Sequence, residues 1–215
     1  RKITMESQKL YRVRREDFPK LEELLARCFC RDPLYCKLIP DENTRERLLP
    51  KLFACDLTEF FDTCEIYSDS PEMNSLLVVS DESEPYNPLT YYLTEAWASL
   101  KTDEYLILED PSLKTLRNFV LGRDYLNSRW TDQLHQEERL HIIYLAVRPE
   151  MQHHGLAALL MEEVIGYADS HGLMISLETH NPDNVPLYEH FGFKVYGVME
   201  KHFDLKQYCM IREKQ

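Results

Sequence analysis

The spacing of apolar residues predicts alternating strands and helices, and the order is clearest in the C-terminal third. The string LHIIYLAV, from position 140, is an apolar run typical of a buried strand. GLAALLMEEVIGYADS then repeats apolar residues at helical spacing until Gly172, which stops the helix. The run LMISLE follows, so the pattern predicts a strand, a helix and a second strand. A short helix at VPLYEHF and a final strand pair, FKVYGVMEKHF and QYCMIRE, complete the prediction.

The N-terminal part of the chain predicts a strand, two helices and a hairpin. Residues 11–14 form the predicted strand, and Asp17 is the expected cap of the helix that follows. A second helix is predicted over residues 43–61. CEIYS and SLLVVS predict an antiparallel strand pair, because the turn-forming string DSPEMN separates them.

Residues 81–138 lack clear strands, and helical stretches are expected near 89–100 and 113–127. Two interpretations of this segment remain open, a structural cover and a variable wall of a substrate site. Its aromatic residues could line an acceptor pocket or pack in the core: Tyr86, Tyr91, Tyr92, Trp97 and Trp130.

Length and composition favour one globular domain over residues 1–215. Of the 215 residues, 44% are hydrophobic and 29% are charged, which excludes wholesale disorder. A net charge of -12 argues against binding nucleic acid or an anionic membrane, and would attract a cationic substrate. The longest apolar run, about eight residues, is too short for a transmembrane helix.

The cysteines and histidines change this picture little. Six cysteines in a chain of this size predict reduced thiols and a cytoplasmic location. Neither the cysteines nor the histidines have the spacing of a zinc motif, so no metal is expected.

The polar turn between the strand at 140–147 and the next helix is a candidate phosphate site. The free N–H groups and partial positive charge of a helix N-terminus suit a phosphate. No G-x-G-x-x-G and no G-K-[ST] occurs, which argues against dinucleotide and Walker-type sites. From the spacing alone, a plain strand-to-helix turn remains the alternative.

Two segments give the chain a family resemblance. VRPEMQHHGLAALLMEEV resembles the Q-x-x-G-x-[GA] acetyl-coenzyme A (acetyl-CoA) loop of the GNAT superfamily of N-acetyltransferases. NPDNVPLYEHFGF is similar to a second segment of that superfamily, and the likeness is clearest over residues 139–212. Two departures are His153 and His154, which stand where a basic residue is usual, so cofactor affinity is expected to rise as pH falls.

The resemblance implies an α/β (α+β) fold with a mixed, splayed central sheet flanked by helices, and a helical insertion before the fourth strand. It implies that acetyl-CoA is the cosubstrate, with its pantetheine arm on the strand and its pyrophosphate on the loop. The implied cofactor-binding residues are Leu145, Ala146, Val147, Gln152, His153, His154, Gly155, Leu156, Ala157, Asn181 and Tyr188.

The implied chemistry is the attack of an amine on a thioester. An alkylamine with a pKa of ~10.4 is neutral in about one molecule in 2,500 at pH 7, a shortfall of roughly 4.6 kcal/mol that a base must offset. His141 is the candidate base, in register with a glutamate of histone-modifying members, and Tyr188 resembles the family's acid for the thiolate. Glu138, Glu178 and His180 are the reserve bases.

The resulting prediction is an acetyl-CoA-dependent N-acetyltransferase that modifies a small primary amine by direct attack in a ternary complex. Two alternatives stay open: a noncatalytic acyl-CoA-binding domain with the same fold, and a protein or peptide N-acetyltransferase. A homodimer is also left open.

Overall fold

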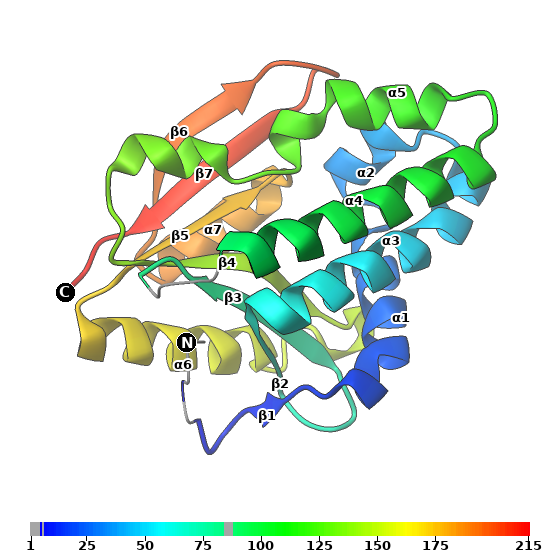
Figure 1. The fold of residues 1–215 in the computed structure, drawn as a ribbon. Coiled ribbons are helices and arrows are strands. Elements are labelled where there is room, and N and C mark those ends of the chain that lie inside the picture. The colour runs from blue at the N-terminus through cyan, green and yellow to red at the C-terminus, as the bar shows by residue number, and fades with distance from the viewer. Residues whose placement is uncertain (1–4, 6, 84–87) are drawn as a thin grey trace.

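The computed structural model describes residues 5, 7–83 and 88–215, which form a seven-stranded sheet flanked by helices (Figure 1). The strand order is β1-β2-β3-β4-β5-β7-β6, and within the described residues only β4 and β5 pair in parallel. The strands are β1 (Tyr11–Arg12), β2 (Glu65–Ser68), β3 (Ser75–Asp81), β4 (Arg139–Val147), β5 (Met174–Thr179), β6 (Lys194–Glu200) and β7 (Lys206–Arg212).

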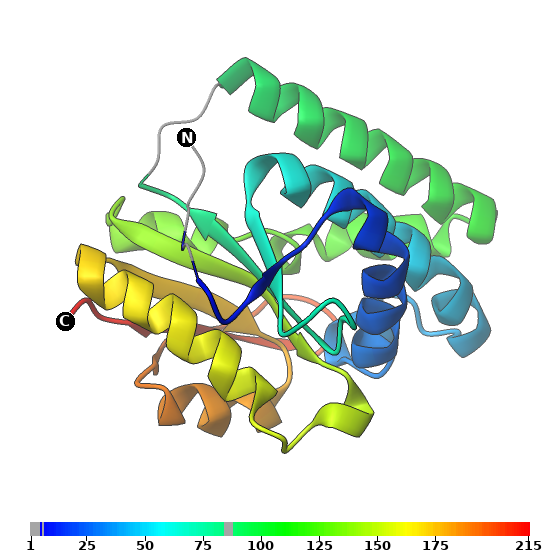
Figure 2. The same ribbon diagram turned by 90° about the horizontal axis from the view of Figure 1, so that it is seen from below.

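Helices cover both faces of the sheet, and each face supports its own apolar core. One core joins the sheet to the N-terminal helices, and the other joins it to α6 (Figure 2). The helices are α1 (Phe18–Phe29), α2 (Pro33–Leu38), α3 (Glu42–Thr63), α4 (Pro88–Glu109), α5 (Lys114–Leu121), α6 (Leu156–His171) and α7 (Val185–His190).

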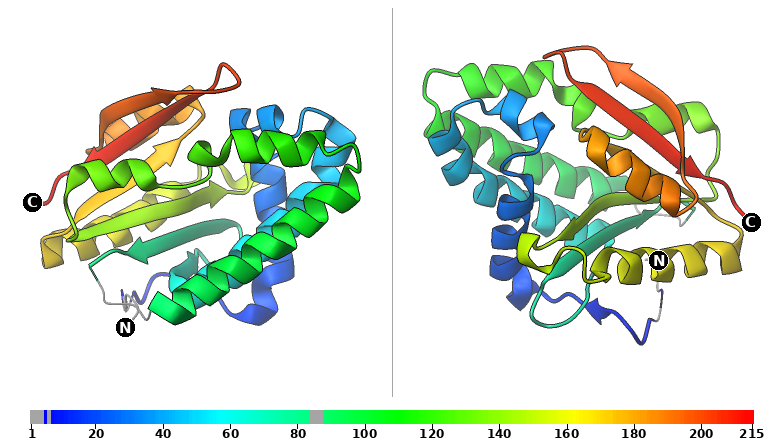
Figure 3. Two further views of the ribbon diagram at one scale, coloured as in Figure 1. Left: turned by 45° about the horizontal axis from the view of Figure 1, so that its top comes forward. Right: turned by 180° about the vertical axis from the view of Figure 1, so that it is seen from behind.

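The central strands part at a bulge in β4. Ile142 pairs with Leu177 in the last parallel pair of β4 and β5, and with Val79 on the other side. The next β3 residue, Val78, pairs with Tyr144, so Ile143 is an extra residue in β4. From there β5 continues beside β7 and β4 beside β3, and a gap opens between the two strands (Figure 3). The splayed sheet expected from the resemblance is therefore present.

The insertion is helical, as expected. Its described residues contain α4, α5 and two short 3-10 turns, η2 (Arg123–Tyr125) and η3 (Arg129–Leu134). The helical stretch predicted over 113–127 breaks at Gly122. A Cβ there would lie 2.7 Å from the Leu38 side chain, so a glycine allows α2 to pack closely against the end of α5.

Three local predictions are wrong. The strand at 11–14 is limited to Tyr11 and Arg12, and α2 was not anticipated, although its cap Asp32 accepts a hydrogen bond from Leu34 N at 2.9 Å. Asp17 precedes α1 without capping it. Its carboxylate accepts instead from the backbone N of Arg14 at 2.9 Å, which ties the end of the strand to the turn.

Candidate active site

The β4 side of the gap presents unpaired backbone groups. Arg148 N donates to Asn74 O on the β3 side, and backbone groups alternate direction along a strand. The peptide groups of Leu145 and Val147 therefore face the gap, whereas those of Ala146 face β3. Val147 O already accepts from Cys28 Sγ at 3.3 Å and from Gln152 Nε2 at 3.4 Å, which fixes the end of the strand.

The loop after β4 ends in an open helix N-terminus. Gly155 precedes α6 with a φ of +82°, and no side chain caps the first turn of the helix. A Cβ on Gly155 would meet nothing within 4 Å, so the conformation, and not crowding, favours glycine here. The first N–H groups of α6, which include those of Leu156 and Ala157, have no intrahelical acceptor and are available to an anion.

The side chains of Gln152 and His154 mainly shape the loop. Gln152 bends back to Val147 O, and His154 Nδ1 lies 2.8 Å from Gln152 O. His153 has a φ of +65° and is exposed. Contacts with a phosphate would therefore come first from main-chain donors.

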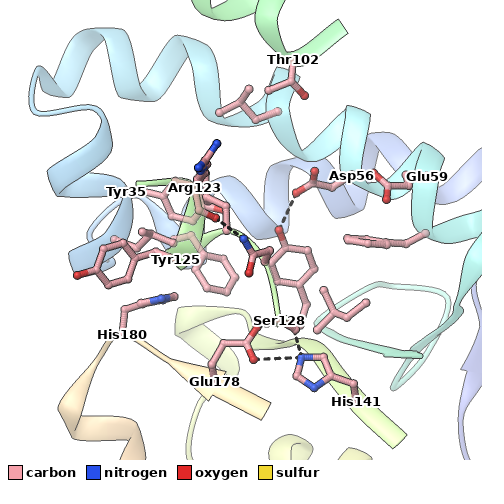
Figure 4. A pocket seen from close by; sticks show the side chains of 18 of the residues that line it. Tyr35, Asp56, Glu59, Thr102, Arg123, Tyr125, Ser128, His141, Glu178 and His180 are labelled. Carbon is pink, nitrogen blue, oxygen red and sulfur yellow. Dashed lines mark hydrogen bonds and ion pairs between the residues drawn. The ribbon is translucent and has the colours of Figure 1, made fainter. Parts of the chain in front are cut away.

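A cavity of about 750 Å³ lies beside the gap, between the sheet and the helical layer (Figure 4). Its lining comes from α1, α3, α4 and α5 on one side and from β4, β5 and α7 on the other. This volume is in the range of pockets that enclose a small organic ligand.

Tyr188 lines the cavity from α7. Its side chain is buried, and its hydroxyl makes no hydrogen bond to any described residue. Burial, followed by the charge of Asp32, raises the pKa of Tyr188 above its usual range. Asn181 shapes the turn before α7, where its side chain accepts from Asp183 N at 3.1 Å.

His141 and Glu178 form a buried pair at the point where β4 and β5 part (Figure 4). His141 Nε2 lies 3.1 Å from Glu178 Oε2 and 2.9 Å from Ser128 Oγ. Trp130 Nε1 and Ser128 Oγ each donate to Glu178 at 2.8 Å. Burial acts to raise the pKa of Glu178, but His141 and the two hydrogen-bond donors outweigh it and lower that pKa. The carboxylate is therefore held ionised.

Both ring nitrogens of His141 have hydrogen-bond partners. Ser176 Oγ accepts from Arg139, donates to Leu140 O at 3.4 Å and lies 2.7 Å from His141 Nδ1. On the other side of the ring, Nε2 faces Glu178 and Ser128. His141 is 3% exposed against 17% for the Glu178 side chain, so Glu178 is the more accessible member of the pair.

The cavity also gathers carboxylates that the sequence did not single out. Asp56 and Glu59, on α3, face it, and Asp56 accepts from Tyr144 Oη at 2.7 Å. Burial raises the pKa of Asp56 to about 6, and burial with the charges of Asp56 and Glu95 raises that of Glu59 to about 7. Helical periodicity did not predict these two carboxylates as part of a site, because polar residues on one side of α3 resemble a solvated face.

The remaining candidates are divided between the cavity and the surface. Trp130 reaches the cavity through its bond to Glu178, whereas Trp97 is 61% exposed and does not line it. His180 lines the cavity and contacts Gln207 at 2.9 Å, whereas Glu138 pairs with Lys214 outside it. Tyr86 and the side chains of Tyr91 and Tyr92 lie outside the described residues.

The described residues contain no group of three or more His, Cys, Asp or Glu side chains placed to hold a metal ion. They also contain no helix that is long and apolar enough to cross a membrane.

Comparison with known proteins shows which family the chain belongs to. The chain is 25% identical over 185 residues to an uncharacterised N-acetyltransferase of Schizosaccharomyces pombe, covering 85% of this chain and 72% of the relative. Its fold is similar to that of the histone acetyltransferase HPA2 and related acetyltransferase from Corynebacterium glutamicum, with a TM-score of 0.64, 17% identity and 96% of each chain covered. It is also similar to the polyamine N-acetyltransferase of Drosophila melanogaster, with a TM-score of 0.53, 17% identity, and 95% of this chain and 98% of that one covered. Residues 62–193 match the Acetyltransferase (GNAT) family, and the chain belongs to that family of acetyl-CoA-dependent acyltransferases.

Proposed function

We propose that this protein transfers the acetyl group of acetyl-CoA to a primary amine of a small molecule, by direct attack in a ternary complex. The observation that carries the proposal is the cavity of about 750 Å³ that reaches both the parted strands and the His141–Glu178 pair. The neighbour that is named as a polyamine N-acetyltransferase supports the same class of acceptor. Residues 1–215 act as one domain, in which 139–212 bind the cofactor and 81–138 cover the acceptor.

The cofactor fits the groups that this chain leaves free. The backbone groups of Leu145 and the N–H of Val147 would pair with the amides of the pantetheine arm, and the N–H groups from Gln152 to Ala157 would hold the pyrophosphate. Because these contacts use main chain, His153 and His154 can replace the usual basic residues without loss of the cradle. When bound, acetyl-CoA supplies the acetyl thioester.

Glu178 is the group proposed to receive the proton of the amine. A cationic amine that enters the cavity meets an ionised carboxylate, which favours its binding but makes Glu178 alone a weak base. His141 stabilises Glu178 from behind, and its Nε2–H can shift between Glu178 and Ser128 as the proton arrives. Glu178 therefore takes the role of base that the sequence first suggested for His141, and His141 supports Glu178 in the pair.

Tyr188 is proposed to stabilise the departing sulfur. An ordinary tyrosine with a pKa of ~10 already loses about 2 kcal/mol in transferring its proton to a thiolate whose conjugate thiol has a pKa of ~8.5. Burial raises the pKa of Tyr188 further, so full transfer is still less favourable. Tyr188 therefore acts as a hydrogen-bond donor to the sulfur.

The cavity supports the small-amine function over the two alternatives. A protein or peptide substrate needs an open groove, whereas α4 and α5 contribute to the lining here. A noncatalytic binding domain needs no polar pair buried at the parted strands, and this chain keeps one.

The test is an assay of free-thiol release from acetyl-CoA across small primary amines, polyamines and peptides that carry a free amine. We expect release with small amines and a mass increase of one acetyl group on the acceptor. Calorimetry with coenzyme A provides the control for a folded, cofactor-binding protein. Cofactor binding without release on any amine would leave the noncatalytic alternative, and release with peptides alone would contradict the small-amine proposal.

A further inference from the structure

The lining of the cavity is strongly acidic. Its lining includes seven carboxylates but, among the described residues, a single guanidinium, that of Arg123, and no lysine. The carboxylates are Asp32, Asp56, Glu59, Glu82, Glu95, Asp103 and Glu178.

Asp56 and Glu59 differ from shielded carboxylates elsewhere in the molecule. Glu109, which is 14% exposed, pairs with two cationic side chains, and Asp169 makes two hydrogen bonds to Arg212. Within the described part of the chain, Asp56 has only the neutral hydroxyl of Tyr144, and Glu59 forms no ion pair. Partly buried charges in proteins normally have a partner, so the cavity lacks positive charge where these two carboxylates face it.

The walls beside Asp56 suit an organic cation. The centroid of the Tyr144 ring lies 5.6 Å from that of Phe29 and 6.0 Å from that of Phe60, and all three residues line the cavity. Aromatic faces attract ammonium groups and pack against methylene chains. A metal ion would find a poorer site, because no set of three or more suitable ligands exists among the described residues.

The carboxylates of α3 and the His141–Glu178 pair line the same cavity. His141 contacts Glu178 and Tyr144 contacts Asp56, and these two β4 residues are three positions apart, with the bulge residue Ile143 between them. Figure 4 shows Asp56 and Glu59 together on one side of the cavity and Glu178 on the other.

We propose that the acceptor carries a second positively charged group, bound by Asp56 and Glu59, while its reacting amine lies at Glu178. The substrate class is thus an aliphatic diamine or polyamine and not a simple monoamine. This inference rests on the proposed function and adds a specificity site to it.

The test compares diamines with monoamines of equal chain length. Thiol release is measured on the full chain with butylamine against diaminobutane, and with hexylamine against diaminohexane. We expect the diamine to have a kcat/KM at least about tenfold higher in one of the pairs, the effect of one additional well-placed charge interaction. Equal values in both pairs would overturn the specificity site while leaving the transferase function intact.

Variants of the two carboxylates locate the effect. In Asp56→Asn and Glu59→Gln, the ratio of diamine to monoamine kcat/KM should fall towards one. Asp62→Asn is the matched control, because Asp62 lies on the same helix but pairs with Arg15 and does not line the cavity. An unchanged ratio in both cavity variants would contradict the proposal. If Asp56→Asn does not fold, Glu59→Gln and the ratio of the unmodified protein decide the question.

Calorimetry with coenzyme A bound separates the two possible failures. Diamine binding that both variants weaken, without acetylation, would overturn the proposed function and support the specificity site. Acetylation of monoamines and diamines with equal efficiency would do the reverse. Neither diamine binding nor thiol release would overturn both.

Discussion

The proposed cofactor side and the proposed acceptor side of the gap are built in different ways. The cofactor side is a continuous stretch, residues 145–157, that offers main-chain groups from a strand end and a helix start. The acceptor side is assembled from helices and strands that are far apart in the sequence, and it offers side chains. The first presents partial positive charge to an anion, and the second presents carboxylates to a cation.

This difference separates cofactor binding, which depends on main-chain groups, from substrate choice, which depends on side chains. Main-chain donors survive substitution, so we expect the loop to bind the cofactor with His153 and His154 in it. Cavity side chains can change without disturbing the sheet, because Asp56 and Glu59 project from α3 into the cavity and not into the core. Substrate choice is therefore expected to depend on the helices that cover the sheet.

The largest effect is expected from Glu178→Gln. Glutamine keeps the size of the side chain and one oxygen that can accept from Trp130 or from Ser128, but it cannot accept the amine proton, so kcat should fall by about 10²- to 10⁴-fold. Affinity for coenzyme A should be nearly unchanged, which calorimetry measures.

Glu138→Gln is the matched control for Glu178→Gln. Glu138 stands just before β4 and is largely exposed, outside the cavity, so its kcat should remain close to that of the unmodified protein. A Glu178→Gln variant with full turnover would show that another group receives the proton, and His141→Gln would then be the next variant to measure.

Tyr188→Phe should have the next largest effect. The variant loses a hydrogen bond to a sulfur that becomes negatively charged, a bond worth about 1.5–3 kcal/mol, so kcat should fall roughly 10- to 100-fold. The ring still packs against Phe193, and acetyl-CoA affinity should be nearly kept. Steady-state kinetics and calorimetry test both parts.

The control for Tyr188→Phe is Tyr196→Phe. Tyr196 lies on β6 with 45% of its surface exposed, and it does not line the cavity. Turnover that persists in Tyr188→Phe would favour water, and not tyrosine, as the donor to the sulfur.

The sequence predicts the proposed cofactor side of the gap better than the proposed acceptor side. The strand at 139–147, the helix from 156 and its stop at Gly172 were predicted closely, because apolar periodicity and a positive-φ glycine are local signals. The two motifs also predicted a backbone stretch for the cofactor, and that stretch lies at the gap between β4 and β5. The sequence did not predict the direction of the peptide groups. The pairing of β4 with β3 shows that those of Ala146 face β3 and those of its neighbours face the gap.

The carboxylates of the proposed acceptor side were not singled out as a site, because their signals are not local. Glu178 was a reserve base, and its proposed role depends on Trp130 and Ser128, which the chain brings to it from the insertion. Asp56 and Glu59 are ordinary polar residues of an amphipathic helix until the cavity is known. Sequence periodicity identifies the buried face of α3 but not the cavity beside it.

On the cofactor side, Gly155→Ala should have a moderate effect. Alanine at a φ of +82° costs about 1–2 kcal/mol, which the loop would relieve by moving its donors, so coenzyme A affinity should fall about five- to tenfold. Gly166→Ala is the control within α6, where a Cβ also meets nothing within 4 Å but the glycine is helical. That change should leave affinity unchanged and add up to about 1 kcal/mol of stability. Equal affinity in both variants would contradict the main-chain cradle.

The smallest effect is expected from the stability of Asp56→Asn as a function of pH. Asp56 faces Tyr144 and Tyr35 from β4 and α2, and Glu59 on its own helix. Burial raises its pKa from 3.8 to about 6, so between these values the folded protein binds more protons than the unfolded chain does. The free energy of unfolding of the ligand-free protein should therefore fall as pH rises through this window, and remain lower above pH 6.

Asparagine removes this penalty and can still accept from the Tyr144 hydroxyl. Asp56→Asn should therefore melt about 2–4 °C above the unmodified protein at pH 8, on the order of 1 kcal/mol after solvent screening, and at the same temperature near pH 4. Differential scanning calorimetry at the two pH values measures the gap, with Asp62→Asn as the control. A saturating diamine should narrow the gap at pH 8, because it binds the folded acidic cavity and stabilises the unmodified protein more than the variant. A gap of the same size at pH 4 and pH 8 would mean that the charge of Asp56 is already neutralised within the fold, and that the acidic wall of the cavity has no need of a second cation.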